Sequence, residues 1–223
     1  MIERTDNTIR VMVTGHRRFS YPSEAENERF GILIRNWLND QLTSLVTNTD
    51  TDVEIEAVSG MALGADTIFA NLALLHDTGL VAAIPFRYQC GWKRERKRNG
   101  NIRYHRVSNK GYWAMHYAGE YFEILTKAKK IVEVDKVKGY AMPRVEPHIY
   151  HPAKFNIRNK WMVDYTLAGK NGVCLAIHSG KPGGTANCVA LAKQAGLQVI
   201  QYWPTHQELD RLKYNNDVSD IPF

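Results

Sequence analysis

Short runs rich in β-branched residues alternate with longer amphipathic stretches along most of this chain, and most of the runs end in a turn that contains glycine or proline. The longer stretches repeat apolar residues at the spacing of a helix with one buried face. This alternation predicts an open, mostly parallel sheet with helices on both faces, which is a doubly wound α/β fold. The predicted strands are 9–13, 53–58, 80–84, 130–134, 173–177 and 199–202; the predicted helices are 28–46, 65–76, 114–128, 156–167 and 186–195, with Asn156 as one N-cap and Thr205 as the cap of a short last helix.

The composition agrees with one folded domain over residues 1–223. Hydrophobic residues make up 44% and charged residues 23% of the chain, which is ordinary for a globular protein. No apolar run approaches the roughly 18 residues that span a membrane, and the first residues lack a signal-peptide pattern, so we expect a cytoplasmic protein without membrane contact. Cys90, Cys174 and Cys188 are widely spaced, which favours reduced structural thiols over a metal site or a catalytic thiol.

Positive charge is concentrated in one segment, about residues 87–110. It holds nine Lys and Arg residues against one acid, Glu95, a net charge of +8 when the whole chain carries +6. We interpret it as a basic insertion into the domain. With Tyr88, Trp92 and Tyr104 interleaved, it could grip a nucleic-acid backbone and stack on bases. The alternative that we prefer is a solvated surface loop or a basic lid over an anionic ligand.

Four turns or helix starts carry residues suited to an anionic ligand. Ligands of doubly wound sheets bind outside the carboxyl ends of the strands. Glycine lets the backbone approach a phosphate, helix N-termini attract anions, and arginine pairs with phosphate through two hydrogen bonds. The predicted ligand-binding residues are Gly15, His16 and Arg17; Ser59, Gly60, Met61, Gly64 and Asp66; Arg158 and Asn159; and Gly183, Gly184, Thr185 and Asn187.

The turn at residues 180–187 is the strongest single signal. Two glycines and a threonine at a strand-to-helix junction form an anion nest. Lys181 precedes the glycines, so the turn is not a GxxxxGK[ST] motif, and it is not GxGxxG either. A P-loop ATPase is therefore excluded. We interpret His16 as a hydrogen-bonding residue, whereas Asp66 either complements the helix dipole or binds a ribose hydroxyl.

Five segments, taken together and in order, carry a family resemblance. They are Val13-Thr-Gly-His-Arg17, Ser59-Gly-Met-Ala-Leu-Gly-Ala-Asp66, Ile84-Pro-Phe86 with Gln89 and Trp92, Arg158-Asn-Lys-Trp-Met-Val-Asp164, and Gly183-Gly-Thr185. Over roughly residues 8–203 the chain resembles the SLOG superfamily of Rossmann-like nucleotide-binding proteins, and its YpsA branch most. The resemblance implies a Rossmann-like fold, a ligand site at the C-terminal edge of the sheet, and a homodimer.

Superfamily relatives include cytokinin-activating phosphoribohydrolases, which split a nucleoside monophosphate at its N-glycosidic bond, and DprA, which binds single-stranded DNA. Others are thought to sense or bind nucleotide-derived signals. The phosphoribohydrolases have a glutamate shortly after their Gly-Thr, but no acid stands between Thr185 and Ala192 here. Their catalytic role is therefore not carried over. The basic insertion, from Lys93 to Lys110, also looks longer than the usual connection in the YpsA branch.

Three functions stay open. The leading hypothesis is binding of a nucleotide or nucleotide-derived small molecule, in a sensor or sequestering role, with Arg17 and Arg158 on phosphates and Asp66 or Asn187 on sugar hydroxyls. The second is a nucleotide N-glycosidase, with Asp66 and Asp164 as candidate catalytic carboxylates. The third is single-stranded nucleic-acid binding through the basic segment at residues 87–110. No cofactor and no metal site are expected.

Overall fold

A computed structural model describes residues 7–16, 24–107, 113–142 and 151–214 of the chain. Its main sheet has six strands in the order β6-β3-β2-β1-β7-β8, and every neighbouring pair is parallel. The strands are short and rich in Val, Ile and Ala, as expected where both faces are covered. They are β1 (Thr8–Gly15), β2 (Glu54–Ser59), β3 (Gly79–Ile84), β6 (Lys130–Glu133), β7 (Lys170–Ile177) and β8 (Gln198–Tyr202).

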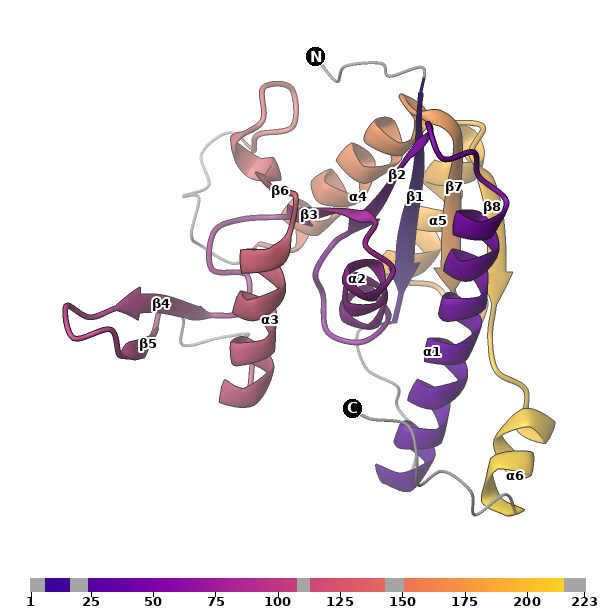
Figure 1. Cartoon of the computed structure of the whole chain (residues 1–223), viewed down its shortest axis with the longest axis horizontal. Coiled ribbons are helices and arrows are strands. Elements are labelled where there is room, and N and C mark those ends of the chain that lie inside the picture. The colour runs from indigo at the N-terminus through magenta and orange to yellow at the C-terminus, as the bar shows by residue number, and fades with distance from the viewer. Residues whose placement is uncertain (1–6, 17–23, 108–112, 143–150, 215–223) are drawn as a thin grey trace.

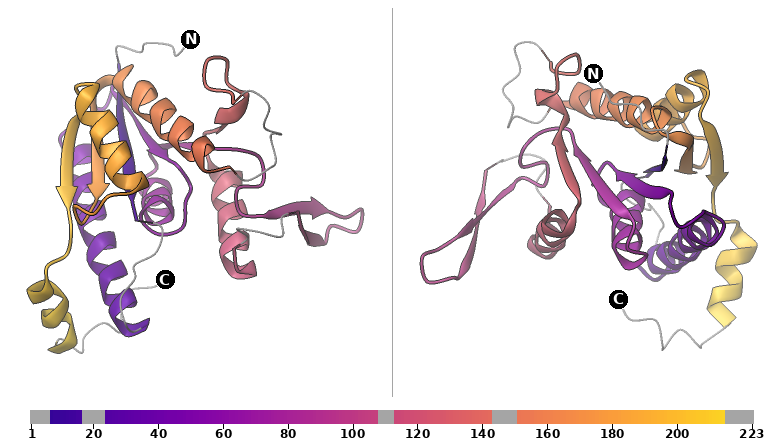
Figure 2. Two further views of the ribbon diagram at one scale, coloured as in Figure 1. Left: turned by 180° about the vertical axis from the view of Figure 1, so that it is seen from behind. Right: turned by 45° about the horizontal axis from the view of Figure 1, so that its top comes forward.

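Helices cover both faces of this sheet (Figure 1; Figure 2, right). One core contains buried side chains of α1, α2 and α3, and a second core contains those of α4 and α5. The structure thus confirms a Rossmann-like, doubly wound α/β fold. Among the described residues, no helix is long and apolar enough to cross a membrane. The helices are α1 (Glu24–Thr47), α2 (Ala65–Leu75), α3 (Met115–Lys127), the 3-10 helix η1 (Val134–Lys136), α4 (Pro152–Leu167), α5 (Gly184–Gln194) and α6 (His206–Tyr214).

The strand order reverses at β1. From this strand the chain adds β2, β3 and β6 on one side, and then returns to add β7 and β8 on the other side. Right-handed crossovers place the helices made before and after this reversal on opposite faces of the sheet. The carboxyl ends of β1 and β7 therefore border a topological switch point, where ligands of such sheets bind.

Of the two predicted helix caps, Thr205 is confirmed and Asn156 is wrong. Thr205 caps α6 as predicted: its Oγ1 accepts a hydrogen bond from Glu208 N at 3.3 Å, and Glu208 Oε2 accepts one from Thr205 N at 2.7 Å. The prediction of Asn156 as an N-cap is wrong, because α4 begins earlier. His151 is its N-cap and accepts a hydrogen bond from Ala153 N, and Pro152 takes the first helical position.

The basic segment contains two strands that the sequence analysis did not predict. Strands β4 (Trp92–Arg96) and β5 (Ile102–Arg106) pair antiparallel as a separate two-stranded ribbon. The ribbon extends away from the main sheet (Figures 1 and 2). Its turn includes Gly100, whose φ of +84° favours glycine. A run of lysines and arginines has no apolar alternation, and so it gave no strand signal.

All three cysteines lie buried in the folded chain without a disulfide partner. Burial raises the pKa of the Cys90 thiol to about 11 and that of Cys188 to about 11. Both thiols are therefore protonated at neutral pH, which suits packing groups rather than nucleophiles.

Candidate functional site

A cavity of about 590 Å³ opens at the C-terminal edge of the main sheet, where β1 ends and α2, α4 and α5 begin. Its size falls within the range of small-molecule sites. All four predicted turns or helix starts contribute to it, although they are far apart in the sequence. The lining residues are Thr14, Gly15, His16, Ala62, Asp66, Pro152, Phe155, Asn156, Arg158, Asn159, Gly183, Gly184, Thr185 and Asn187. Arg17 lies outside the described residues.

Hydrogen bonds hold the loop between β2 and α2 in a compact conformation. Ser59 Oγ donates a hydrogen bond to Asp66 O at 2.7 Å and accepts one from Met61 N at 3.1 Å. Gln89 Nε2 donates to Met61 O at 2.8 Å. Met61 and Gly64 have φ values of 55° and 98°, in the left-handed region. Of the predicted residues, Ser59, Gly60, Met61 and Gly64 are therefore framework rather than lining, and they fix the position of Asp66.

Arg158 and Asp66 form a buried ion pair in this cavity. Arg158 Nη1 lies 3.1 Å from Asp66 Oδ2, and the two side chains are 7% and 5% exposed. Gly60 makes room for the guanidinium, because a Cβ at Gly60 would lie 1.2 Å from Arg158 Nη1. Arg158 Nε has no hydrogen-bond partner among the described residues. The guanidinium is therefore held in place with donor capacity to spare.

Two helices begin at the cavity without a side-chain cap within the described residues. Helix α2 starts after Gly64 and α5 starts after Gly183, so neither N-cap side chain accepts an N–H group. Gly15 lets the start of α2 pack close to the end of β1, since a Cβ there would lie 2.3 Å from Ala65 Cβ. Asn159 Nδ2 donates to Gly184 O at 3.4 Å and ties α4 to the start of α5. Two positive helix ends thus border the cavity together with Arg158.

His16 is held at the rim by aromatic and polar neighbours. Its Nε2 lies 3.3 Å from Ser179 Oγ, and its ring meets the Trp203 ring edge-to-face at 5.1 Å. Burial, followed by the charges of His178 and Lys181, lowers the pKa of His16. His16 is therefore neutral at neutral pH and can gain a proton when an anion arrives.

The structure does not bring the two candidate catalytic carboxylates together. Asp164 is not among the lining residues; its Oδ2 accepts hydrogen bonds from Tyr140 Oη and Lys160 Nζ, each at 2.6 Å. Asp66 is the one acidic side chain among the described lining residues, and it is paired with Arg158. In the described part of the chain, no group of three or more His, Cys, Asp or Glu is placed to hold a metal ion.

Sequence reasoning missed several lining residues, of which Phe155 is the most informative. It lies on the same helix as Arg158 and Asn159, three and four positions earlier, so all three share one face of α4. The guanidinium carbon of Arg158 lies 6.0 Å from the centre of the Phe155 ring. Helical spacing from Arg158 was the signal that could have found it. Thr14, Ala62, Pro152 and Asn156 are the other missed residues.

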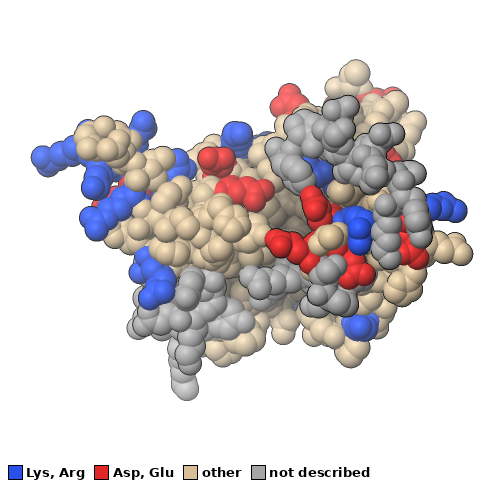
Figure 3. All heavy atoms as spheres, turned by 90° about the horizontal axis from the view of Figure 1, so that it is seen from below, with Lys and Arg blue, Asp and Glu red and all other residues tan. Residues whose placement is uncertain are grey.

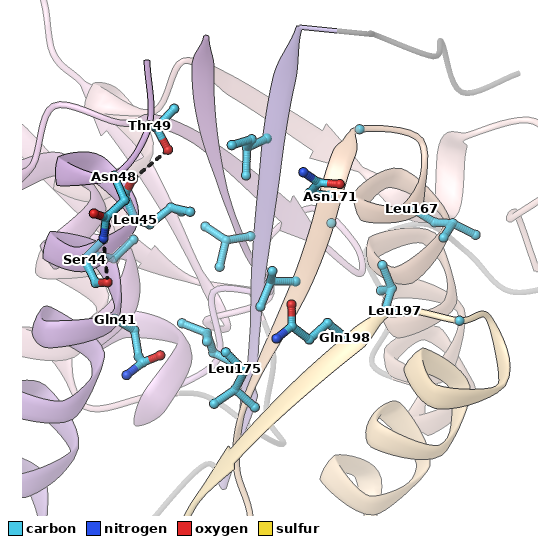
Figure 4. A pocket seen from close by; sticks show the side chains of 18 residues that line it. Gln41, Ser44, Leu45, Asn48, Thr49, Leu167, Asn171, Leu175, Leu197 and Gln198 are labelled. Carbon is cyan, nitrogen blue, oxygen red and sulfur yellow. Dashed lines mark hydrogen bonds between the residues drawn. The ribbon is translucent and has the colours of Figure 1, made fainter. Parts of the chain in front are cut away.

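A larger hollow, of about 720 Å³, lies between α1 and strands β7 and β8 (Figure 4). Apolar side chains and amides line it, and none of its described lining residues is charged. Asn48 and Thr49 hydrogen-bond to carbonyls of the preceding helical turn, Asn48 Nδ2 to Ser44 O at 2.8 Å and Thr49 Oγ1 to Leu45 O at 2.6 Å. The hollow has no cationic group for a phosphate, so the cavity at the strand ends is the candidate site.

Fold and cavity together define a Rossmann-like α/β protein with a small-molecule-sized site at its switch point. No protein-family model matches the chain. An uncharacterized SPbeta prophage-derived protein of Bacillus subtilis (strain 168), YoqJ, is 29% identical over 98 residues, which are 44% of this chain and 54% of YoqJ. Among solved structures, DNA processing protein A (DprA) from Streptococcus pneumoniae matches at 13% identity with a TM-score of 0.47, over 92% of this chain and 55% of that chain. Each match thus spans about half of the relative's length.

Proposed function

We propose that the chain binds a nucleotide or a nucleotide-derived small molecule in the cavity at the strand ends, as a sensor or a sequestering protein. The observation that carries this proposal is the buried Arg158, fixed by Asp66 at 3.1 Å beside the uncapped starts of α2 and α5. Membership of the SLOG superfamily, in its YpsA branch, belongs to the same proposal and is supported by the order of the five motifs.

The phosphate of the ligand binds between Arg158 and the start of α5. Gly183 and Gly184 offer backbone N–H groups there, and the Thr185 hydroxyl lines the same wall. An arginine beside a helix N-terminus combines a full charge with directed donors, which suits a phosphate rather than a neutral ligand. Neutral His16 at the rim adds a hydrogen bond to this end of the ligand.

The sugar and base occupy the remainder of the cavity. Asn187 is exposed at the wall of α5, where its amide can bind a sugar hydroxyl. Asp66 also lines the cavity, and its carboxylate, while paired with Arg158, can accept a further hydrogen bond from a sugar hydroxyl. The half-buried Phe155 ring offers a flat apolar surface for a base.

The arrangement of carboxylates supports binding over N-glycosidic hydrolysis. Hydrolysis needs a carboxylate beside the anomeric carbon and a second group that activates water. Asp66 is held in an ion pair, and Asp164 is hydrogen-bonded outside the lining. No second carboxylate reaches the cavity from the described residues.

A thermal-shift screen with mononucleotides, NAD, ADP-ribose and cyclic dinucleotides tests the proposal. At a ligand concentration of about 100 times Kd, binding adds about 2.7 kcal/mol and raises Tm by roughly 5–10 °C. Asn187→Ala should reduce this rise, because it removes an exposed lining group without touching the core. Asn36→Ala, at an exposed position of α1, is the matched control and should leave the rise unchanged. An equal ligand-induced rise in Tm in the Asn187→Ala and Asn36→Ala variants would contradict binding at this cavity.

A further inference from the structure

The β4–β5 ribbon is an arm whose charge far exceeds that of the fold that carries it. Residues 92–106 contain seven Lys and Arg residues against the single acid Glu95, a net charge of +6 that equals the net charge of the whole chain. Figure 3 shows these cations gathered over the projecting arm at the left of the view. The carboxylate of Glu95 lies 2.9 Å from His105 Nε2.

The base of the arm is fixed to the body. Trp92 Nε1 donates a hydrogen bond to Trp113 O at 2.8 Å, and Val107 N donates to Gly91 O at 2.9 Å. The Tyr104 ring packs against the Phe122 ring of α3, with the ring centres 5.8 Å apart. Trp92 and Tyr104 therefore anchor the arm instead of forming a stacking surface.

The outer part of the arm is rich in exposed cations, with Asn99, Asn101 and Ile102 beside them. Arg96, Lys97 and Arg98 lie at its turn, all exposed and without an ion-pair partner among the described residues. A hollow of about 450 Å³ at the base is lined by Arg87, Lys93 and Arg94 together with Glu133 and apolar side chains. Arg87 is paired there with Glu133 at 3.9 Å, so Lys93 and Arg94 are the cations that continue the positive surface toward the body. No residue of the ribbon is among those that line the strand-end cavity, so the arm is not placed as a lid over the ligand.

We propose that the β4–β5 arm binds duplex nucleic acid through its phosphates, at a surface separate from the small-molecule cavity. A two-stranded ribbon has the width that enters the major groove. Five of the seven cations are arginines, which pair with phosphate through two hydrogen bonds. Single-strand binding depends on stacking of bases on free aromatic rings, and here Trp92 and Tyr104 are committed to packing. The structure thus favours a duplex over the single strand that the sequence alone suggested.

Fluorescence anisotropy of the full chain with a labelled duplex of about 20 base pairs, two turns of B-DNA, tests this proposal. Affinity for the duplex should fall steeply between about 50 and 200 mM salt, as counterions are released from each contacted phosphate. The triple variant Arg96→Gln/Lys97→Gln/Arg98→Gln should bind at least about 10-fold more weakly at low salt, with a salt slope smaller by about 2–3. These side chains are exposed at a turn, so circular dichroism should show an unchanged fold.

The matched control is Lys127→Gln/Lys138→Gln/Lys170→Gln, which removes the same charge from exposed lysines outside the arm. It should bind the duplex as the wild type does. The proposal is overturned if both triple variants lose affinity equally, if the duplex does not bind at low salt, or if a single strand of the same sequence binds more tightly. Binding to anionic phospholipid vesicles in place of the duplex would overturn it too. The Asn187→Ala variant should keep its affinity for the duplex, because Asn187 lines the cavity and not the arm. Failure of the cavity proposal can therefore be told apart from failure of the arm proposal.

Discussion

Arg158 Nη1 and Asp66 Oδ2 lie 3.1 Å apart across the strand-end edge of the sheet, although 92 positions separate the two residues in the sequence. This buried pair joins the start of α2 to α4 and fixes the one guanidinium in the described cavity wall. A buried ion pair adds little to stability by itself, but removing one partner leaves the other charge buried without compensation. Its retention at the cavity agrees with a role in holding an anion.

Neutralising one member of this ion pair should lower the free energy of unfolding more than neutralising both members. Asp66→Asn leaves the Arg158 charge buried without its carboxylate, and we expect the free energy of unfolding to fall by about 3 kcal/mol. The double variant Asp66→Asn/Arg158→Gln has no buried charge at this position and should recover part of that loss. Urea denaturation of both variants measures the coupling. Losses that simply add would speak against a coupled pair.

Gly60 should tolerate no side chain while Arg158 is present. A methyl group there would meet Arg158 Nη1 at 1.2 Å, so Gly60→Ala displaces the guanidinium and lowers stability by about 1–3 kcal/mol. Gly31→Ala is the matched control, since Gly31 lies within α1 with no atom in the way. That change should be neutral or stabilise by about 0.5–1 kcal/mol. Similar losses in both variants would show that Gly60 is not a packing requirement.

Acid should weaken the fold through Glu56. Burial opposes ionisation of this carboxylate, but hydrogen bonds from Tyr165, Lys129 and Arg10 outweigh it and lower the pKa of Glu56. A lowered pKa contributes stability above the ordinary glutamate range, and this stability is lost as pH falls from about 5 toward 3.

Tyr165→Phe isolates this effect, because it removes only the hydroxyl that donates to Glu56 Oε2 at 2.8 Å. At neutral pH the free energy of unfolding should drop by about 1–2 kcal/mol, and the difference from wild type should narrow as Glu56 gains its proton. Urea titrations across the acid range provide the measurement. Tyr117→Phe, at an exposed position, should show no such change. A difference that stays constant with pH would rule out the assignment to Glu56.

Binding of an anionic ligand should tighten in mild acid because of His16. Burial, His178 and Lys181 lower the pKa of free His16, and a bound phosphate raises it again. Affinity should therefore increase as pH falls below neutrality through the interval between these two pKa values. His16→Asn should flatten the profile, which titration calorimetry at several pH values can follow. An equally steep profile in the variant would exclude His16 as its source.

The parallel sheet and the position of the cavity could be predicted, because strand–helix alternation implies parallel strands and the carboxyl ends of such strands share one edge. The Arg158–Asp66 pair could not, since no local pattern links residues so far apart. Gly15 and Gly60 were interpreted as places where the backbone meets a phosphate; in the structure they make room for Ala65 and Arg158, and Gly15 also lines the cavity. The glycines were identified correctly as points of close approach, but sequence alone does not say what approaches.

The start of α4 and the strands β4 and β5 were not predicted, because the local sequence signals for them are weak. His151 is a less usual N-cap than Asn156, so the stronger local preference indicated the wrong start for α4. Half of the residues in strands β4 and β5 are Lys or Arg, and Trp92 and Tyr104 of these strands contact distant residues of the body. Tertiary contacts of this kind override local propensity.

Ligand binding at the strand-end cavity is measured by equilibrium dialysis of the full chain against mononucleotides, NAD, ADP-ribose and cyclic dinucleotides, with both chambers read by chromatography. We expect one compound to accumulate, intact, on the protein side, and Asn187→Ala to reduce this excess whereas Asn36→Ala does not. An even distribution of every compound, or release of free base or nicotinamide, would contradict a binding role for the cavity.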